Sequence, residues 1–252
     1  MKKKKKSKAI VINKISKEYV LHHQKPTFFG TIFGLEKRQR FFALKDVSLK
    51  IYKGEKIGII GSNGSGKTTL LKIAAGITTQ TSGKIKAYGK VVSLIELGAG
   101  FHPELTGREN IFLNGLVIGM DKDEIKKKYD SIVEFSGLGD FIHSPLYTYS
   151  SGMSLRLGFS IAVHSNPDVL ILDEEIAVGD EKFRKKSMKK INEFSRKGIT
   201  IILVSHWLDY IRKNCNRIVW LEKGNIKADG GEEIIDEYVD FLKKAGKYYY
   251  VI

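Results

Sequence analysis

Residues 57–68 read IGIIGSNGSGKT, an apolar run followed by a glycine-rich loop that ends in Gly-Lys-Thr. The loop at 61–68 fits a phosphate-binding pattern of glycine, four residues, Gly-Lys, then Ser or Thr. Its glycines let the backbone curl so that successive N–H groups point at phosphate oxygens. IGII predicts a strand before the loop and TLLKIAA predicts a helix after it, which is the context that the pattern requires. We therefore predict a nucleotide phosphate site built on a strand, a loop and a helix.

The loop supplies most of the candidate nucleotide-binding residues. Lys67 would neutralise the β- and γ-phosphates and is also a candidate catalytic residue, while the Thr68 hydroxyl would bind Mg²⁺. A bare glycine-rich turn is the weaker interpretation, because Lys67 would then be an unpaired charge in a tight loop. The set expected to bind the nucleotide is Gly61, Ser62, Asn63, Gly64, Ser65, Gly66, Lys67, Thr68 and Thr69.

Two acidic residues end a second apolar run, VLILDE at 169–174. Asp173 stands at the carboxyl end of the predicted strand, where a carboxylate can bind Mg²⁺. Glu174 beside it can polarise a water molecule and is a candidate catalytic residue. Four apolar residues and two acids are a weak signal alone, but they follow a phosphate loop and complete its set of ligands.

A third apolar run, TIILVSHW at 200–207, ends in the same way and delivers His206. In an open parallel sheet, ligands bind beyond the carboxyl ends of the strands. We therefore expect Lys67, Asp173, Glu174 and His206 to meet at one edge of the sheet. This shared edge makes His206 a candidate catalytic residue, although a histidine after a strand is more often structural.

Short apolar runs recur along the chain and predict the strands of an α/β fold. They lie at 9–12, 57–60, 169–172, 200–204 and 217–221. Continuous apolar runs suit strands that are buried on both faces, so we expect them to form a parallel sheet. LEKGNIKADG at 221–230 predicts a turn between antiparallel strands near an edge.

The segment at 98–155 has helical periodicity and no clear strand, so it predicts a helical subdomain inserted into the α/β layer. The whole chain, 1–252, is expected to be a single domain. Its other expected parts are the core at 8–97 and 156–225, an aromatic and basic insertion at 24–42, and a C-terminal helix and tail at 226–252.

The composition limits the partners and the compartment. The formal net charge is +15 and the pI is near 9.6, which suits nucleic acid, an anionic membrane surface or a polyanionic substrate alike. No apolar run approaches the roughly 20 residues that cross a bilayer, so membrane association is expected to be peripheral. The single cysteine, Cys215, rules out an internal disulfide and suits a reducing cytoplasm.

YSSGMSLRLGFSIA at 149–162 predicts a helix that begins at Ser150, Ser151 and Gly152. A plain N-cap would use these residues, and so would an anion site at a helix N-terminus. The chain already has a complete set of phosphate and magnesium ligands, so a second anion site in the same protomer is not needed. We therefore expect a homodimer, in which Ser150 and Gly152 of one subunit close over the γ-phosphate bound by the other.

With these motifs in this order, the chain closely resembles the ATP-binding-cassette (ABC) ATPases over nearly its whole length. The resemblance implies an ABC-type nucleotide-binding domain that binds ATP and Mg²⁺ as a homodimer. Its fold would have a RecA-like parallel core, an antiparallel β edge and an inserted helical subdomain. Residues 149–153 become the signature motif, which acts in trans, and His206 becomes the switch histidine. AVGD at 177–180 becomes the dimer-contacting D-loop, with Asp180.

The resemblance also places Tyr19 of ISKEY against the adenine ring. Phe41 and Phe42 are the alternatives, because the insertion at 24–42 blurs the alignment. A role for Tyr19 in core packing is a further alternative.

The chain departs from the family pattern in two places. YSSGM stands where the usual signature is Leu-Ser-Gly-Gly-Gln, although the serine hydroxyl and the glycine N–H survive. Glu96 stands nearest the place of the Q-loop glutamine that links nucleotide to transporter. ELGAGFHPELTGREN at 96–110 and AVGDEKF at 177–183 are similar to the ATPase subunits that export lipid-linked polysaccharides.

This narrower resemblance implies an ATP-hydrolysing motor that exports lipid-linked O-antigen, capsule or teichoic acid. Two copies would dock on two copies of a membrane-spanning permease, peripherally at the cytoplasmic face of the inner membrane. An ABC exporter of another lipid or a drug is the closest alternative. A soluble ABC ATPase that acts on nucleic acid or the ribosome would suit the charge. Such proteins usually fuse two cassettes or insert long coiled coils, so no nucleic-acid partner is expected.

Overall fold

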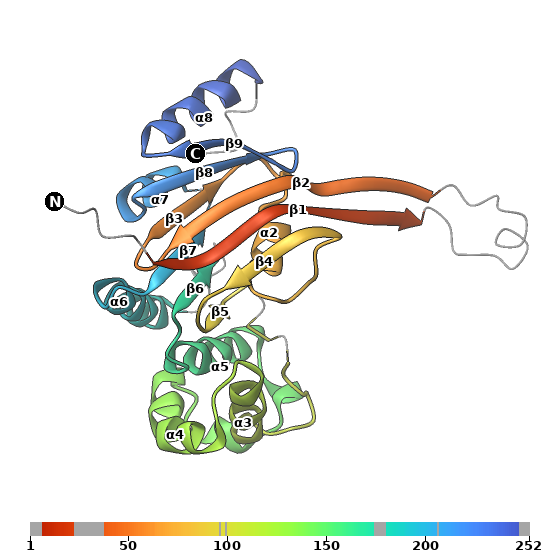
Figure 1. Ribbon diagram of the computed structural model, residues 1–252. Coiled ribbons are helices and arrows are strands. Elements are labelled where there is room, and N and C mark those ends of the chain that lie inside the picture. Colours follow the sequence, from red (N-terminus) through yellow and green to blue (C-terminus); the bar gives the residue numbers. More distant parts are fainter. Residues whose placement is uncertain are drawn as a thin grey trace, which may run out of the picture.

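Two β-sheets form the frame of the molecule (Figure 1). One has six strands in the order β5-β6-β7-β3-β8-β9, and the other has three in the order β2-β1-β4. The computed structural model describes residues 7–22, 38–95, 97–98, 100–173, 180–205 and 207–246.

The six-stranded sheet is parallel except at one edge, where β9 runs antiparallel to β8. The hairpin between β8 and β9 confirms the turn and the antiparallel edge that were predicted at 221–230. The strands of this sheet are β3 (Lys56–Ile60), β5 (Val91–Ser93), β6 (Val169–Leu172), β7 (Thr200–Val204), β8 (Arg217–Glu222) and β9 (Asn225–Gly230).

Both faces of this sheet are buried, as the continuous apolar runs predict. Successive side chains of a strand point to opposite faces, so Val169 and Ile171 of β6 enter one apolar core while Leu170 and Leu172 enter another. The first core lies under helix α2 (Lys67–Ala74) and the second sheet. The second core contains residues of the helices α5 (Ser151–His164), α6 (Glu181–Arg196), α7 (Leu208–Asn214) and α8 (Glu233–Lys244).

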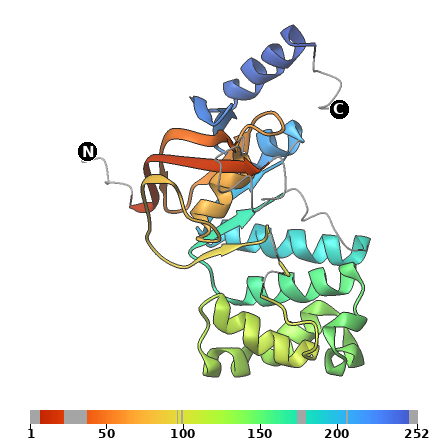
Figure 2. The same cartoon turned by 90° about the vertical axis from the view of Figure 1, so that its right-hand side faces the viewer.

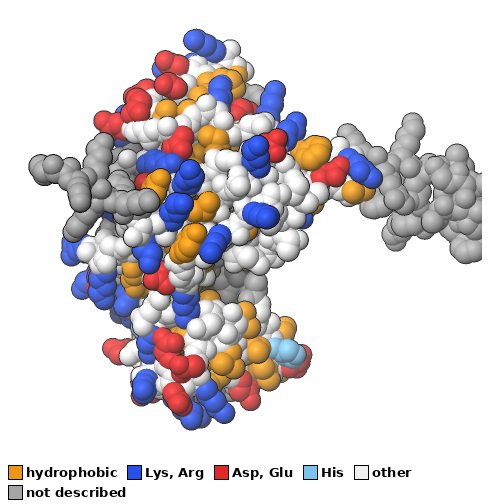
Figure 3. Space-filling model, viewed as in Figure 1, with side chains coloured by type: hydrophobic (Ala, Val, Ile, Leu, Met, Phe, Trp, Pro, Cys, Tyr) orange, Lys and Arg blue, Asp and Glu red, His pale blue; other side chains and the backbone are white. Residues whose placement is uncertain are grey.

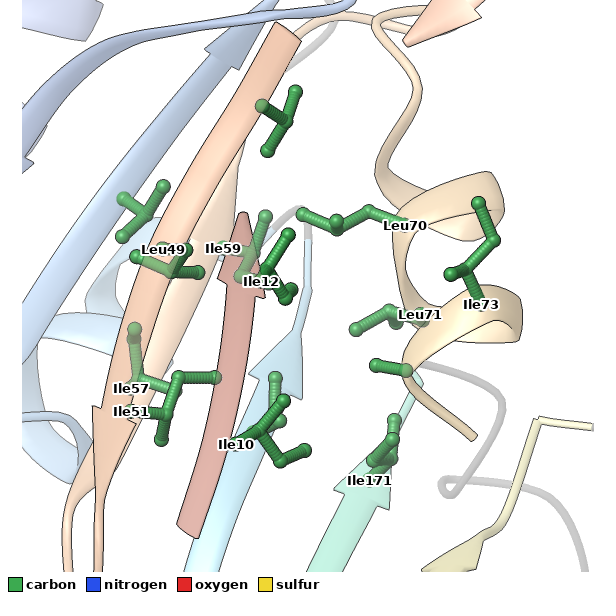
Figure 4. Packing of buried hydrophobic residues seen from close by; sticks show 14 of the residues in the cluster. Ile10, Ile12, Leu49, Ile51, Ile57, Ile59, Leu70, Leu71, Ile73 and Ile171 are labelled. Carbon is green, nitrogen blue, oxygen red and sulfur yellow. The ribbon is translucent and has the colours of Figure 1, made fainter. Parts of the chain in front are cut away.

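The three-stranded sheet is antiparallel and consists of β1 (Lys8–His22), β2 (Arg38–Tyr52) and β4 (Ser82–Ala87). The apolar run at 9–12 lies in β1, so its predicted place in the parallel sheet is wrong. The run is apolar because Ile10 and Ile12 pack into the same core as Ile57 and Ile59 of β3 (Figure 4). Burial alone does not tell a strand of the central sheet from one that is packed upon it.

The helical layer confirms the inserted helical subdomain. Thr106 and Glu109 form a capping box at the start of α3 (Gly107–Val117), and Asp121 caps α4 (Lys122–Ser136). Two short 3₁₀ helices follow, η1 (Gly139–His143) and η2 (Leu146–Thr148). These elements share an apolar core with α5.

Helix α5 lies between the helical layer and the core (Figure 2). It runs without interruption through residue 155, so the boundary expected between the helical subdomain and the second part of the core divides one helix. Of the insertion expected at 24–42, residues 24–37 lie outside the described residues and 38–42 belong to β2. Among the described helices, none combines the length and the apolar character that crossing a bilayer requires.

Candidate functional site

The phosphate loop and the first acidic residue meet at the carboxyl edge of the central sheet. The loop follows β3, Asp173 follows β6, and β7 lies between these two strands. Lys67, Thr68 and Asp173 line one pocket of about 300 Å³ at this edge. The structure therefore brings together the described residues that were predicted to meet here.

Two glycines of the loop allow close packing against backbone from both sheets. A Cβ atom at Gly61 would lie 2.0 Å from the carbonyl oxygen of Leu221 in β8, and one at Gly66 would lie 2.4 Å from that of Ala43 in β2. Both glycines have positive φ values, +150° and +104°, which side chains disfavour. Gly64 also has a positive φ of +75°, but a Cβ there would meet nothing within 4 Å.

The β8–β9 hairpin holds the loop from the side. The Ser62 hydroxyl donates to a carboxylate oxygen of Glu222 at 2.8 Å. The N–H of Gly224 donates to the carbonyl of Ser65 at 2.9 Å, and the N–H of Lys45 donates to Gly224 at 2.8 Å. No sequence motif indicates that Glu222 or Gly224 supports the site, because these contacts join segments far apart in the chain.

The Lys67 side chain is buried and lies within the loop. Its Nζ donates to the carbonyl oxygens of Gly61 at 2.7 Å and Ser62 at 3.0 Å. Helix α2 has Gly66 as its N-cap, and no side chain caps it there. The first N–H groups of a helix have no intrahelical acceptors. A buried ammonium beside such N–H groups is suited to a phosphate.

The donors around the pocket fit Mg²⁺. Thr68 and Asp173 provide a hydroxyl and a carboxylate, and Mg²⁺ prefers oxygen ligands. No group of three or more His, Cys, Asp or Glu side chains that could hold a metal ion occurs within the described ranges. In proteins, one or two side chains usually hold Mg²⁺ together with substrate phosphates and water.

An aromatic pair forms one wall of the pocket. Tyr19 and Phe41 both line it, with their ring centroids 5.5 Å apart and an interplanar angle of 24°. They are register partners in β1 and β2, so their side chains share a face. Phe42 is opposite Glu18 on the other face and does not line the pocket. Of the three aromatic candidates for an adenine contact, Tyr19 and Phe41 therefore line the pocket and Phe42 does not.

The predicted signature residues stand at a helix N-terminus, apart from this pocket. The Ser150 hydroxyl accepts from the N–H of Met153 at 3.2 Å and caps α5. Tyr149, which replaces the usual leucine, donates through its hydroxyl to the carbonyl of Phe141 at 2.6 Å. Ser150, Ser151 and Gly152 do not line the pocket of the phosphate loop in the same chain.

Asp180 connects the N-terminus of α6 to a side chain of α5. Its carboxylate accepts from the N–H of Phe183 at 2.8 Å and so caps α6. It also pairs with Arg156 of α5, at 3.5 Å. No sequence motif points to Arg156, although it stands in the helix that begins with the predicted signature.

Three candidate site residues lie outside the described residues: Glu96, Glu174 and His206. The same holds for residues 177–179 of the predicted D-loop. Their neighbours Asp173, Asp180 and Ser205 are described.

Comparison with known proteins places this site in a family. The family model described as ABC transporter matches residues 44–177, which is more than half of the 252 residues. A dimeric ATP-binding cassette in a post-hydrolysis state with ADP and phosphate has a TM-score of 0.68 at 22% identity, over 88% of this chain and 98% of that one. An ATP-binding subunit of an ABC transporter has a TM-score of 0.68 at 21% identity, over 95% of this chain and 94% of that one.

Closer relatives are found among curated proteins. The chain is 43% identical to an O-antigen export system ATP-binding protein of Klebsiella pneumoniae, over 90% of this chain and 96% of the relative. It is 48% identical to a teichoic acids export ATP-binding protein of Enterococcus faecalis, over 91% of this chain. It is also 48% identical to an O-antigen export protein of Myxococcus xanthus, over 81% of this chain. The chain spans only 52% and 47% of the last two relatives.

The motifs, the two-sheet fold and these similarities agree with one another. The chain belongs to the ABC transporter family and is an ATP-binding, ATP-hydrolysing subunit of that family.

Proposed function

We propose that this chain is the ATP-hydrolysing motor of an exporter that moves a lipid-linked polysaccharide across the cytoplasmic membrane. The polysaccharide would be an O-antigen, a capsule or a teichoic acid. The observation that carries this proposal is the similarity to export proteins for two such polymers, one of them matched over 96% of its length. The alternative substrate is another lipid or a drug, since substrate choice would fall largely to the membrane permease.

Hydrolysis follows from the groups around the phosphate loop. Lys67 and the N–H groups at the start of α2 would bind the β- and γ-phosphates and stabilise the charge that develops on transfer. Thr68 and Asp173 would hold Mg²⁺, which neutralises phosphate charge when bound. Glu174 would orient or deprotonate the attacking water, and His206 would contact the γ-phosphate. The base would stack on the pair of Tyr19 and Phe41.

The active form would be a homodimer with composite sites. Ser150 and Gly152 lie apart from the pocket in one chain, so they would act on the nucleotide of the second copy. The Ser150 hydroxyl accepts from Met153, and its proton stays available for donation to a γ-phosphate oxygen. Asp180 would lie at the contact between the copies.

Two copies of the chain would dock on two copies of a membrane-spanning permease, at the cytoplasmic face. The segment at 98–155 would act as the helical subdomain that passes the motion of the ATP-driven dimer to the permease. Glu96 would lie at this link, in the place of the usual glutamine.

The export proposal is tested by deletion and complementation in the native host. Loss of the chain should leave lipid-linked glycan in the cytoplasm and deplete it from the surface. The wild-type chain should restore export. The Glu174→Gln variant replaces the carboxylate by an amide of similar shape, so it should bind ATP and fail to restore export. Normal surface glycan in the deletion strain would contradict the proposed cargo.

The composite site is tested by mixing inactive variants. A Ser150→Asp chain and a Lys67→Ala chain should each have little ATPase activity as homodimers. Their mixed dimer contains one interface with both Ser150 and Lys67 intact, so mixing should restore part of the activity. No recovery in mixed dimers isolated with two different affinity tags would contradict the arrangement in trans.

A further inference from the structure

A second and larger cavity lies on the other side of the catalytic edge. It has a volume of about 790 Å³, compared with about 300 Å³ for the pocket of the phosphate loop. It is bounded by α6, by the start of α7 and by the carboxyl ends of β6 and β7. We call it the α6–α7 groove. Its volume lies in the range of sites that bind small molecules, about 300–1,000 Å³.

The floor of the α6–α7 groove is apolar. Leu172 and Leu203 come from the central sheet, and Met188 and Ile191 come from α6. The Tyr210 hydroxyl of α7 donates to the Met188 sulfur at 3.7 Å and closes the floor between the two helices. An apolar floor of this kind contributes affinity by removing apolar ligand surface from water.

The rim of the groove is basic. Arg184, Lys185, Lys189 and Arg196 line it, against the acidic residues Asp173 and Glu193. Lys185 pairs with Glu181 at 2.7 Å, and Glu193 pairs with Lys190 at 3.9 Å. Within the described part of the chain, Arg184, Lys189 and Arg196 have no carboxylate partner.

Three of the basic rim residues, Lys185, Lys189 and Arg196, lie four and seven residues apart on one exposed stripe of α6, and Arg184 lines the groove from the adjacent side of the helix. Figure 3 shows Lys and Arg side chains gathered over α6. These cations are available to an anion that enters the groove.

Trp207 stands at the mouth of the groove and is 67% exposed. The other tryptophan, Trp220, is buried under α8, at 3% exposure. Large exposed aromatic side chains beside basic residues are typical of binding sites. The backbone N–H of Trp207 donates to the Ser205 hydroxyl at 3.0 Å, at the carboxyl end of β7, and both residues line the groove.

We propose that the α6–α7 groove binds a small amphipathic anion, with its apolar body on the floor and under Trp207 and its anionic head on Arg184 and Lys189. The site is separate from the pocket of the phosphate loop and requires a different ligand chemistry. Asp173 lines both cavities, and Ser205 and Trp207 flank position 206. The occupant therefore lies where it can affect the catalytic edge.

The probe for this site is 8-anilinonaphthalene-1-sulfonate, a fluorescent amphipathic anion that accepts excitation energy from nearby tryptophan. The full chain should bind it with emission sensitised by Trp207. In the Trp207→Phe variant the probe should still bind, as seen by direct excitation, but the sensitised emission should fall. Unchanged sensitised emission in this variant would place the probe elsewhere and overturn the proposal.

Charge reversal on the rim tests the anionic head. The double variant Arg184→Glu/Lys189→Glu should weaken probe binding on the order of tenfold, since two attractive charges near the sulfonate are replaced by two repulsive ones. The control, Lys182→Glu/Lys84→Glu, makes the same change in net charge at exposed residues that do not line the groove. Equal weakening in both double variants would mean that the net charge of the protein, and not the rim of the groove, sets the affinity for the probe. That result would overturn the proposed site.

Displacement of the probe shows whether the groove needs a ligand with an apolar body, an anionic head or both. Dodecyl phosphate, below its critical micelle concentration, should displace the sulfonate, because it has both an apolar body and an anionic head. Dodecyl maltoside and inorganic phosphate each have one of the two features and should not displace it. Displacement by the maltoside would mean an apolar site only, and displacement by phosphate would mean an anion site only. Either result would overturn the amphipathic assignment.

Discussion

Gly66 and Gly64 lie two residues apart in the phosphate loop. Gly66 is packed against backbone, whereas Gly64 faces open space. Gly66→Ala would force a Cβ against the Ala43 carbonyl and keep a φ of +104°, so we expect a loss of several kcal/mol from steric clash and strain together. Gly64→Ala has open space and should lose only the left-handed strain, about 1–2 kcal/mol. Urea unfolding of both variants without nucleotide measures the difference, and equal losses would contradict the packing of the loop against β2.

Ser150 has two separable roles, as the cap of α5 and as the proposed phosphate contact. Ser150→Ala should lower the free energy of unfolding by about 1 kcal/mol, because the cap is lost. Ser150→Asp should keep the stability, since Asp caps as well as Ser. Its ATPase activity should nevertheless fall by roughly tenfold or more, because a carboxylate repels the γ-phosphate. Urea unfolding and ATPase rates together decide this, and wild-type activity in Ser150→Asp would exclude the phosphate contact.

At the scale of elements, His164 lies where α4, α5 and α6 come together. Its ring packs edge-on against Phe135 of α4, and its Nδ1 lies 2.7 Å from the carbonyl oxygen of Ser160. Burial lowers the pKa of His164, and the nearby ammonium groups of Lys190, Lys128 and Lys186 lower it further. The ring is thus neutral in the folded protein at a pH where an unfolded histidine still binds a proton.

This lowered pKa predicts a pH dependence of stability. In the unfolded chain the histidine has a pKa near 6.5. His164 therefore makes its full contribution to the free energy of unfolding above that pH. It is lost as the pH falls toward the lower folded value, because protons then favour the unfolded state. Between pH 7.5 and pH 5.5, the free energy of unfolding measured in urea should fall less for His164→Gln than for the wild type. An equal loss in both would assign the pH dependence to other groups.

The elements also show how far the sequence predicts this fold. The central strands and the helical segment follow from continuous apolar runs and helical periodicity, which are local signals. The place of β1 does not, because Ile10 and Ile12 are buried equally well in a sheet packed on the core. Nor could the sequence choose between Phe41 and Phe42. That choice depends on the register between β1 and β2, which puts Phe41 opposite Tyr19.

The candidate site is predictable in the same unequal way. Lys67, Thr68 and Asp173 stand in motifs whose strand context fixes where they lie. The hydrogen bond between Ser62 and Glu222 joins residues that are 160 positions apart, and no local sequence pattern predicts such a contact. The α6–α7 groove is also invisible in the sequence, since it exists only where two helices and two strands meet.

At the scale of the whole molecule, Cys215 reports on global opening. Burial raises the pKa of its thiol to about 12, so the folded protein should react slowly with a thiol reagent at neutral pH. ATP at 100 times its Kd should stabilise the fold by about 2.7 kcal/mol and slow labelling by about 100-fold, if opening is global. Labelling of the single cysteine, with Lys67→Ala as the unprotected control, checks this. A rate independent of ATP would show that α7 opens alone.

The hydrogen bonds that hold the phosphate loop have a consequence for the nascent chain on the ribosome. Ribosomes release the N-terminal part first, yet the loop at 61–66 rests on β2 on one side and on the β8–β9 hairpin on the other. A nascent chain that ends before residue 222 therefore has the glycines, the lysine and β2, but it lacks Glu222 and Gly224, which hold the loop from the other side. We expect such a chain to bind ATP more weakly than one that includes the hairpin, because its loop is held on one side only.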